Sequence, residues 1–481
     1  MVAPCTKSIL EIFQDFDARR CGRIAQSDLE AVLLCICGVS RDLAQQWIQS
    51  SGAAELEDVD YRIFMAWMFE EEKSRADTAE KLYERGFSVR QLIQFVRRHR
   101  SLGLHDLSRM STADVVRDIV IPETKERQCA MVELFEGGPR EPMCLMSHWW
   151  GHSFMSLVEA ILGHASGQVL PSEKLLSEEE LEKTYWLCIF GVNQHKSICG
   201  TGANPCDCGA VKYLNGHPLC EMDKFGLMMR HFKEHALAAD RELETFKRIW
   251  VLKELQTALA MGMRTEFCGT ITSNISFALL SVREAQASRD EDRRMILAEI
   301  EQTMGIDEFD DSIRAKVREE QAKLTIFEAI VRRQVDIVEF HLKENPLLCN
   351  VQLRQFGMKT PLHFMAERSR TASEWEDFSG RTALLQSLLD ARADASICDA
   401  SGRSVLHAMC MWDGDVQLAK KLISARADPN ERATRGAVAN KTPLEVLQHG
   451  VSIPFFDRGY KSRSARQTEE LLQYLASLTS P

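Results

Sequence analysis

The sequence lacks any apolar run long enough to span a bilayer. Its longest apolar stretch, Ala31 to Val39, is typical of a buried helix. An acidic residue interrupts the N-terminal segment before the apolar core of a signal peptide could form. The sequence also lacks a strong excess of either charge, and a net charge of -11 over 481 residues argues against a general nucleic-acid binder. These absences predict a cytoplasmic protein without a membrane span and without nucleic-acid partners.

Cysteine is present, but the count of 15 is odd, which favours free thiols or metal ligands over a disulfide framework. In a reducing compartment most cysteines stay as thiols. A chain of 481 residues is too long for one hydrophobic core, so about three domains are expected. The apolar fraction of 45% and the charged fraction of 27% are those of an ordinary soluble globular protein.

The C-terminal third of the chain repeats a short motif. It reads Thr360-Pro-Leu-His in the first copy, Ser404-Val-Leu-His in the second and Thr442-Pro-Leu-Glu in the third. A second motif, ending in Ala-Arg-Ala-Asp, follows at Leu388 and again at Leu422. Both motifs resemble those of ankyrin repeats, which open a first helix with T-P-L-H-x-A and have a period of about 33 residues.

The resemblance implies stacked helix pairs that bind another protein and do no chemistry. It gives His363 and His407 a packing role, although the two histidines could otherwise suggest a metal or catalytic pair. Because the spacing between copies exceeds the usual period, insertions are expected at Arg370–Gly380 and Arg432–Ala439. Leu324–Asn350 resembles a degenerate first repeat, so we expect at least three repeats and a fourth, weaker one.

Residues 9 to 70 show two helix–loop–helix patterns with apolar residues at helical spacing. Phe13, Asp17, Gly22 and Ile24 resemble an EF-hand. In that family Asp17 would be the first loop ligand, Gly22 the turn residue and Ile24 the residue that pairs with the second loop. The resemblance therefore implies a pair of EF-hand-like units at the N-terminus.

The ligand positions of these loops depart from the calcium-binding pattern. Calcium needs oxygen ligands at loop positions 3, 5 and 12, and here Arg19, Cys21 and the short Asp28 stand there. In the second loop Val59 is the pairing residue and the apolar Ile63 falls at position 12. We expect Ile63 and the basic loop to prevent tight calcium binding, while the pairing residues preserve the fold.

A different pattern begins near Met143, where short apolar runs alternate with longer helical segments, as in an α/β domain with a parallel sheet. The predicted buried strands are Met143–Ser147, Trp186–Gly191, Ala236–Ala239 and Thr265–Cys268. The first strand runs into Ser147-His-Trp-Trp-Gly, and a later helix carries Trp250-Val-Leu-Lys-Glu254-Leu. Together they resemble a TIR (Toll/interleukin-receptor-like) domain over roughly residues 140–285, a module also seen in large multidomain protist signalling proteins.

Some TIR domains cleave the nicotinamide–ribose bond of NAD with a glutamate in that helix, so the resemblance implies Glu254 as a catalytic candidate. A carboxylate suits this chemistry because it stabilises the positive charge of an oxocarbenium-like state. Trp250 would pack at the pocket wall. Ser147 and His148 lie where ligands enter parallel sheets, Ser147 as a second catalytic candidate and His148 as a cofactor-binding one.

The chain departs from the TIR pattern in two places. Val251 stands where the family usually has cysteine, and Arg248 replaces a residue that is small in many members. These departures leave a second interpretation open, in which Glu254 is a surface acid and the domain only associates with itself.

A cysteine-rich insertion at residues 195–222 has no counterpart in ordinary TIR domains. Its cysteines follow the spacing C-x6-C-x-C-x11-C, at Cys199, Cys206, Cys208 and Cys220. His195 and His217 lie nearby, and glycines supply tight turns. Four thiolates in a reducing compartment favour a structural, tetrahedral zinc site. The alternative is four unrelated free thiols in a loop.

The sequence therefore predicts a multidomain α and α/β protein. The expected parts are a degenerate EF-hand pair (1–75), a helical connector (76–135), a flavodoxin-type TIR-like domain (136–285), a charged helical connector (286–322) and ankyrin repeats (323–481). The favoured function is an intracellular scaffold or signalling adaptor that binds proteins through the repeats and the TIR-like domain. The alternatives are an NAD-cleaving enzyme that uses Glu254, and a calcium-responsive EF-hand regulator. Structural zinc is the expected cofactor, and NAD is the substrate that the enzyme alternative implies.

Overall fold

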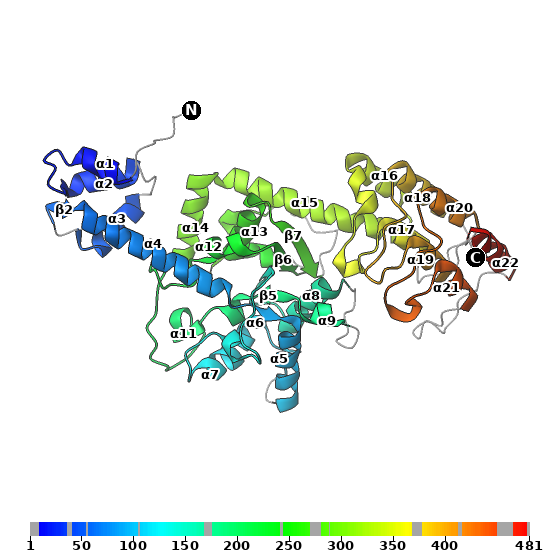
Figure 1. Cartoon of the computed structure of the whole chain (residues 1–481), viewed down its shortest axis with the longest axis horizontal. Coiled ribbons are helices and arrows are strands. Elements are labelled where there is room, and N and C mark those ends of the chain that lie inside the picture. Colours follow the sequence, from blue (N-terminus) through cyan, green and yellow to red (C-terminus); the bar gives the residue numbers. More distant parts are fainter. Residues whose placement is uncertain are drawn as a thin grey trace.

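The structure is a computed structural model of the chain. It describes residues 9–35, 41–53, 56–103, 106–167, 176–240, 244–269, 280–287, 289–367, 378–411, 416–449 and 465–478. The described part is elongated, with a helical unit at one end, an α/β part in the middle and stacked helices at the other end (Figure 1). It is a mixed α and α/β structure. Among the described helices, none is both long and apolar enough to cross a membrane.

The N-terminal unit has two helix–strand–helix halves. They comprise α1 (Ile9–Phe16), β1 (Arg23–Ala25) and α2 (Gln26–Cys35), then α3 (Arg41–Ser50), β2 (Asp58–Asp60) and α4 (Tyr61–Tyr83). The predicted pairing of Ile24 with Val59 is confirmed, because these residues lie opposite each other in the antiparallel β1–β2 pair. The rings of Phe13 and Tyr61 stack with centroids 5.6 Å apart, so the two halves share one core.

Helix α4 joins the N-terminal unit to the α/β part (Figure 1). Asp60 caps the start of this helix, since its carboxylate accepts hydrogen bonds from the backbone N–H groups of Arg62 (3.0 Å) and Ile63 (3.2 Å). Near the other end Leu82 is buried, and its carbonyl accepts a 2.8 Å hydrogen bond from the indole N–H of Trp186. The helix is thus fixed at both ends.

The central sheet has five strands in the order β3-β5-β4-β6-β7. They are β3 (Phe87–Ser88), β4 (Cys144–Ser147), β5 (Thr184–Trp186), β6 (Glu234–Ala239) and β7 (Arg264–Gly269). Strands β4 to β7 run parallel to their neighbours, and β3 pairs antiparallel with β5 at the edge. Along the chain, the parallel strands therefore have the order second, first, third, fourth, which is the order of flavodoxin-type sheets.

Three of the four predicted strands are confirmed as β4, β6 and β7. The prediction of a strand over Trp186–Gly191 is wrong beyond its first residue, because β5 ends at Trp186 and Cys188–Gly191 forms the short helix α10. Gly191 lies against the indole of Trp186, where a Cβ atom would come within 2.7 Å of Nε1. The chain turns back over the tryptophan at this point instead of extending.

Residues 87–135, expected within a separate helical connector, share the core of the α/β part. Besides β3 they form α5 (Val89–Leu102), α6 (Thr112–Val115), the π-helical turn Val116–Val120 and α7 (Ile121–Thr124). The ring of Phe95 lies near those of Phe154 and Phe190, at 6.0 and 5.1 Å between centroids. The core therefore begins well before the expected boundary at residue 136.

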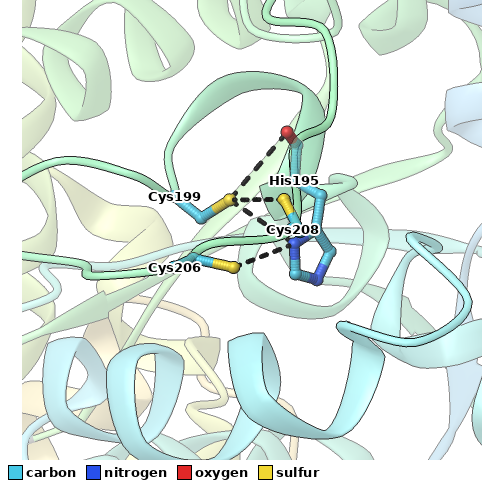
Figure 2. A group of neighbouring side chains, drawn as sticks. All are labelled: His195, Cys199, Cys206 and Cys208. Carbon is cyan, nitrogen blue, oxygen red and sulfur yellow. Dashed lines mark hydrogen bonds between the residues drawn. The ribbon is translucent and has the colours of Figure 1, made fainter.

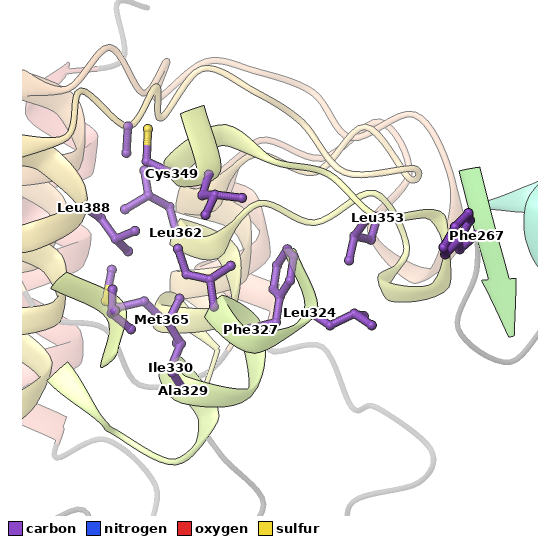
Figure 3. Packing of buried hydrophobic residues seen from close by; sticks show 14 of the residues in the cluster. Phe267, Leu324, Phe327, Ala329, Ile330, Cys349, Leu353, Leu362, Met365 and Leu388 are labelled. Atoms are coloured by element: carbon purple, nitrogen blue, oxygen red, sulfur yellow. The ribbon is translucent and has the colours of Figure 1, made fainter. Parts of the chain in front are cut away.

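The C-terminal part is a stack of helix pairs. The first helices of the pairs pack against one another in chain order. They are α15 (Ile306–Val331), α17 (Pro361–Ala366), α19 (Val405–Met411) and α21 (Pro443–His449). The second helices are α16 (Val335–Glu344), α18 (Phe378–Asp390), α20 (Val416–Ser424) and α22 (Ala465–Leu478). Helix α15 crosses the expected boundary at residue 322 without a break. One hydrophobic core runs from Phe267 of β7 through Leu324 and Phe327 to Leu362 and Leu388 (Figure 3).

Two loops of the stack contact the α/β part. Of the expected insertions, most of 370–380 lies outside the described residues, which resume at Phe378. The other, Arg432–Ala439, contains the 3-10 turn Gly436–Val438, and its Arg435 pairs with Glu180 at 2.6 Å. This ion pair links the insertion to the α/β part.

A second contact comes from Arg354, in the 3-10 turn Arg354–Phe356 before α17. Its guanidinium lies 3.0 Å from Glu266 Oε2 and 3.8 Å from Glu234 Oε2, and it donates a 2.8 Å hydrogen bond to the carbonyl of His164. Glu234 is the first residue of β6, and Glu266 lies within the neighbouring strand β7. The helix stack is therefore anchored directly to one end of the parallel sheet.

Candidate functional site

Strand alternation places two polar side chains under one helix. In β4, Cys144 and Met146 pack in the core covered by α8 (Phe154–Ser166), so Ser147 points to the opposite face. The neighbouring parallel strand β6 presents His235 on that same face. Helix α13 (Ile249–Ala260) covers this face and brings Glu254 to it.

The hydroxyl of Ser147 lies between His235 and Glu254. Its Oγ is 2.9 Å from His235 Nε2 and makes a short hydrogen bond with Glu254 Oε2. Ser147 and His235 are buried, and Glu254 is half-buried. The structure thus brings together two residues that the sequence nominated and adds His235, which sequence reasoning missed. The signal that could have revealed it was the alternation along β6, which puts His235 on the face of Ser147.

The electrostatics of this cluster differ from those of exposed side chains. Burial raises the pKa of Glu254 to about 7, although the hydrogen bond from Ser147 opposes the shift. Burial lowers the pKa of His235 to about 3, so its imidazole is neutral. Its Nδ1 is buried and has no hydrogen-bond partner among the described residues. The cluster therefore holds a carboxyl group that exchanges its proton near neutral pH, a property typical of functional carboxyls.

This arrangement is not a Ser–His–acid triad. In a triad the acid contacts the outer nitrogen of the histidine and the histidine takes the serine proton. Here Glu254 contacts Ser147 directly, and His235 has too low a pKa to act as a base at neutral pH. In this arrangement the hydroxyl of Ser147 orients the carboxylate of Glu254.

A cavity of about 120 Å³ opens beside Glu254, between α12 (Phe225–Met228), α13 and α14 (Asp290–Thr303). Trp250 also lines it, and its ring packs edge-on against Phe225 with centroids 6.5 Å apart. Much of the remaining wall is apolar, with Met222, Met229, Met295 and Ile296. Trp250 and Glu254 thus share one small, largely apolar cavity.

His148, nominated for cofactor binding, is buried but does not line this cavity. Burial lowers its pKa to about 4, and its Nε2 has no hydrogen-bond partner within the described part of the chain. The structure therefore separates His148 from the space that Trp250 and Glu254 share.

A second group of chemically active side chains lies in the cysteine-rich insertion. His195, on α11 (Gln194–Ser197), and Cys199, Cys206 and Cys208 offer four ligand atoms that all lie within 4.8 Å of one another (Figure 2). The three cysteines are free thiols. The group has the composition of a site that could hold a metal ion such as zinc.

The predicted ligand set is corrected at one position. Cys220 lies outside the group, and His195 takes its place. Cys220 is buried elsewhere, with its Sγ 3.7 Å from Asn215 Oδ1. The next residue, Glu221, is held by an ion pair with Arg85 at 2.8 Å. This pair fixes the end of the insertion away from the other three cysteines.

Cys144, His164 and Glu234 form another group with ligand atoms within 4.8 Å of one another. The guanidinium of Arg354 already lies there, bonded to the carbonyl of His164 and close to Glu234. Burial also raises the pKa of the Cys144 thiol well above its ordinary value, which disfavours the thiolate. A positive side chain thus stands where a cation would need to bind, so the group serves as an anchor for Arg354.

The acids of the expected calcium loop, Asp17 and Asp28, lie in different settings. Asp17 is buried, and its carboxylate accepts hydrogen bonds from the backbone N–H groups of Cys21 (3.0 Å) and Gly22 (2.6 Å). Gly22 has a φ of +81°, which lets the chain turn back onto Asp17. Burial raises the pKa of Asp17, but the hydrogen bonds from Gly22 and Cys21 outweigh burial and lower it. Asp28 lies in the first turn of α2.

The fold and the sites define a mixed α and α/β protein with a Ser–His–Glu cluster beside a cavity and a separate His–Cys group. Comparison of the chain with protein-family models gives no match, and comparison with curated protein sequences gives none either. The interpretation of its function therefore rests on the residues described above.

Proposed function

We propose that the chain is a scaffold or signalling adaptor that binds partner proteins through C-terminal ankyrin-like repeats. The observation that carries this proposal is a hydrogen bond that recurs between successive helix pairs. His363 Nε2 lies 3.0 Å from the carbonyl of Arg403, and His407 Nε2 lies 2.9 Å from the carbonyl of Lys441. Each contact links one helix pair to the loop that opens the next, as a stacked array requires.

The other nitrogen of each histidine caps its own helix. His363 Nδ1 accepts a hydrogen bond from the backbone N–H of Thr360 at 3.2 Å, and His407 Nδ1 accepts one from Ser404 at 3.1 Å. Nε2 must then carry the proton and donate to the carbonyl. Both nitrogens of each imidazole are used inside the stack, which supports a packing role. Glu445 takes the same capping place in the last copy.

The second helices offer a surface for a partner. A groove of about 600 Å³ lies between α16 and α18 and is lined in part by Leu342 and Arg392. Phe340 on α16 and Leu347, just after that helix, do not line the groove, but they are 61% and 81% exposed. Contacts of such exposed apolar groups drive protein association. We therefore expect a Phe340→Asp, Leu347→Asp double variant to release the partner.

Affinity purification of the full chain from cells that express it would test this proposal. The double variant should lose proteins that the parent chain retains, and Val211→Asp, at a 68% exposed residue of the insertion, should retain them. The same set of co-purifying proteins from the parent and the double variant would count against binding through this surface.

A second candidate function is cleavage of NAD by a TIR-like α/β part, and the contact of Ser147 with Glu254 beside the cavity favours it. In this reaction the bond from the ribose to the nicotinamide nitrogen breaks, nicotinamide leaves and water adds to the ribose. Positive charge develops on the ribose, and an ionised Glu254 would stabilise it. Ser147 would hold one carboxylate oxygen, Trp250 would form the wall, and a pKa of about 7 keeps Glu254 ionised above neutral pH.

Release of nicotinamide from NAD tests this candidate. Glu254→Gln should abolish the release, and Ser147→Ala should lower it about tenfold or more, because the carboxylate loses its positioning hydrogen bond. Glu308→Gln, at an exposed glutamate of α15, is the matched control and should leave the rate unchanged. Absence of nicotinamide release from the parent chain at high protein concentration would refute this candidate while leaving the adaptor proposal intact.

Three further roles complete the proposal. Zinc is the ion proposed for the group around His195, and self-association of the TIR-like part would let the adaptor cluster its partners. The hydrogen bonds that occupy the Asp17 carboxylate support an N-terminal unit that works as a helical module without calcium.

A further inference from the structure

We propose that the cysteine-rich insertion closes around one zinc ion bound by His195 Nδ1 and by the thiolates of Cys199, Cys206 and Cys208. This inference rests on the zinc cofactor proposed above and names its ligands and its role. The ion is structural: it holds residues 195–208 in the shape that packs on the chain segment between β3 and β4. The site is separate from the cavity beside Glu254.

The distances between the ligand atoms suit a tetrahedral ion. Zn–S bonds of about 2.3 Å and Zn–N bonds of about 2.0–2.1 Å place neighbouring ligand atoms about 3.5–3.8 Å apart. His195 Nδ1 lies 3.4 Å from Cys199 Sγ and 3.7 Å from Cys206 Sγ, and the Sγ atoms of Cys199 and Cys208 are 3.6 Å apart (Figure 2). A disulfide would need sulfur atoms about 2.0 Å apart. The spacing therefore fits an ion at the centre of the group.

Thr124 determines which nitrogen of the His195 imidazole carries the proton. Its Oγ lies 2.6 Å from the carbonyl of Val120, a distance at which the hydroxyl proton must lie between the two oxygens. The hydroxyl oxygen then accepts at its 2.9 Å contact with His195 Nε2. Nε2 therefore carries the proton and Nδ1 presents its lone pair to the sulfur atoms. Metal-binding histidines are commonly oriented by such a hydrogen bond on the other nitrogen.

The charges around the group also suit zinc. Three thiolates and a neutral imidazole give a Zn²⁺ site a net charge of minus one. The ammonium of Lys212 lies 2.9 Å from Cys199 Sγ and also donates to the carbonyl of His195, so it balances this charge. Four protein ligands leave no open coordination position, which distinguishes a structural site from a catalytic one.

The ion would connect the insertion to the chain segment around α7. Thr124, the last residue of α7, holds His195, and the side-chain amide of Gln128 donates a 2.8 Å hydrogen bond to the carbonyl of Cys208. Asn193, two residues before His195, donates to the carbonyl of Gln128 at 2.6 Å. Loss of zinc should therefore loosen residues 195–208 from this segment first.

Metal analysis of the full chain, purified with zinc and dialysed against a mild chelator, tests the proposal. The parent chain and Cys220→Ser should each hold about one zinc per chain, whereas a Cys206→Ser, Cys208→Ser double variant should hold less than about a fifth of that. His195→Ala should lose most of its zinc, and His195→Cys, which offers a fourth thiolate, should regain it. Rescue by His195→Cys distinguishes a ligand from a residue that only supports the fold.

Cobalt gives a second readout on the parent chain, where no variant can misfold. Co²⁺ should replace zinc and give the intense visible bands of tetrahedral cobalt together with a thiolate charge-transfer band. If Cys220→Ser loses its zinc and His195→Ala keeps it, the proposed ligand set is wrong but zinc remains the cofactor. A folded parent chain that takes up neither metal would overturn both. Neither readout depends on NAD or on a partner protein.

Discussion

His235 Nε2 lies 2.9 Å from Ser147 Oγ, and both side chains are buried beneath helix α13. The same oxygen is hydrogen-bonded to Glu254. Because a hydroxyl has one proton, a proton on Glu254 Oε2 is coupled to the tautomer of His235. When Glu254 is ionised, Ser147 donates to it and His235 donates from Nε2. When the proton of Glu254 is on Oε2, Glu254 donates to Ser147, which then donates to Nε2 of the other tautomer.

We expect His235→Leu to raise the pKa of Glu254, because the ionised carboxylate loses the chain of donors that supports it. If Glu254 must be ionised for nicotinamide release, the rise of activity with pH should move up by about one unit, a tenfold change in proton affinity. His235→Gln keeps an N–H donor and should retain the parent profile.

Other titratable side chains around Glu254 are the same in both His235 variants. Among them are Cys188, which lies near the Glu254 carboxylate, and Asp223, Lys253 and Glu299, which line the cavity. A difference between the leucine and glutamine variants therefore reports on the donor at residue 235 alone. Identical pH profiles for the parent chain and the leucine variant would contradict a positioning role for His235.

Glu254 should make stability depend on pH in the direction opposite to most carboxylates. Its pKa is raised from 4.5 to about 7, so the folded state binds the proton more tightly than the unfolded state. This contribution is fully present below about pH 4.5 and is lost as the pH rises through about 7. Glu254→Gln, which stays neutral, should be about 1–3 kcal/mol more stable than the parent chain at pH 8 and close to it at pH 4. Thermal unfolding at the two pH values checks this, and a parent chain that is the more stable at pH 8 would contradict it.

Arg354 should contribute strongly to stability because its partners are also shielded from water. The side chains of Arg354, Glu234 and Glu266 are 16%, 19% and 16% exposed. Removing one member of such a group leaves uncompensated charge, so Arg354→Ala should lower the free energy of unfolding by about 2–4 kcal/mol. Arg332→Ala is the control, since Arg332 is 61% exposed and lies 3.9 Å from Glu328, and it should cost less than about 1 kcal/mol. Urea unfolding that shows equal costs would contradict the anchoring role.

Local sequence patterns predicted the helices and strands that are set by neighbouring residues. Elements that are set by contacts between distant residues could not be predicted in this way. Ile24 and Val59 pair as expected because each occupies a fixed place after a turn. Trp186–Gly191 is apolar throughout, and such a run suits a buried strand or a buried helix equally. The contact of Gly191 with the indole of Trp186 decides between them, and no local pattern contains it.

The candidate sites show the same division. Motifs nominated Ser147 and Glu254, but His235 reaches them only through the register of two parallel strands. Likewise, cysteine spacing does not reveal which ligands reach one point in space. The ion pair of Glu221 with Arg85 holds Cys220 elsewhere, and Thr124, some 70 residues before the insertion, turns His195 toward the cysteines.

Asp17 should stabilise the N-terminal unit without calcium. Its carboxylate accepts hydrogen bonds from Cys21 and Gly22, so Asp17→Ala should lower the melting temperature of this unit, by the same amount in calcium and in a chelator. Asp58→Ala, at an exposed carboxylate in β2, should change little. Calorimetric titration should show no micromolar calcium binding. A calcium-dependent rise in the melting temperature that Asp17→Ala abolishes would contradict this prediction.

His407 should couple the last helix pairs to the rest of the stack. His407→Ala removes the hydrogen bonds to the Ser404 N–H and the Lys441 carbonyl and leaves a buried cavity, so the free energy of unfolding should fall by about 2–4 kcal/mol. In a stack whose pairs contact only their neighbours, the loss should spread outward from the break. Hydrogen exchange should therefore speed up in α21 and α22 more than in α15, and His449→Ala, at an exposed histidine of α21, should leave the pattern unchanged. Equal loss of protection in α15 and α21 would show that the stack unfolds as one unit and that His407 is not a local link.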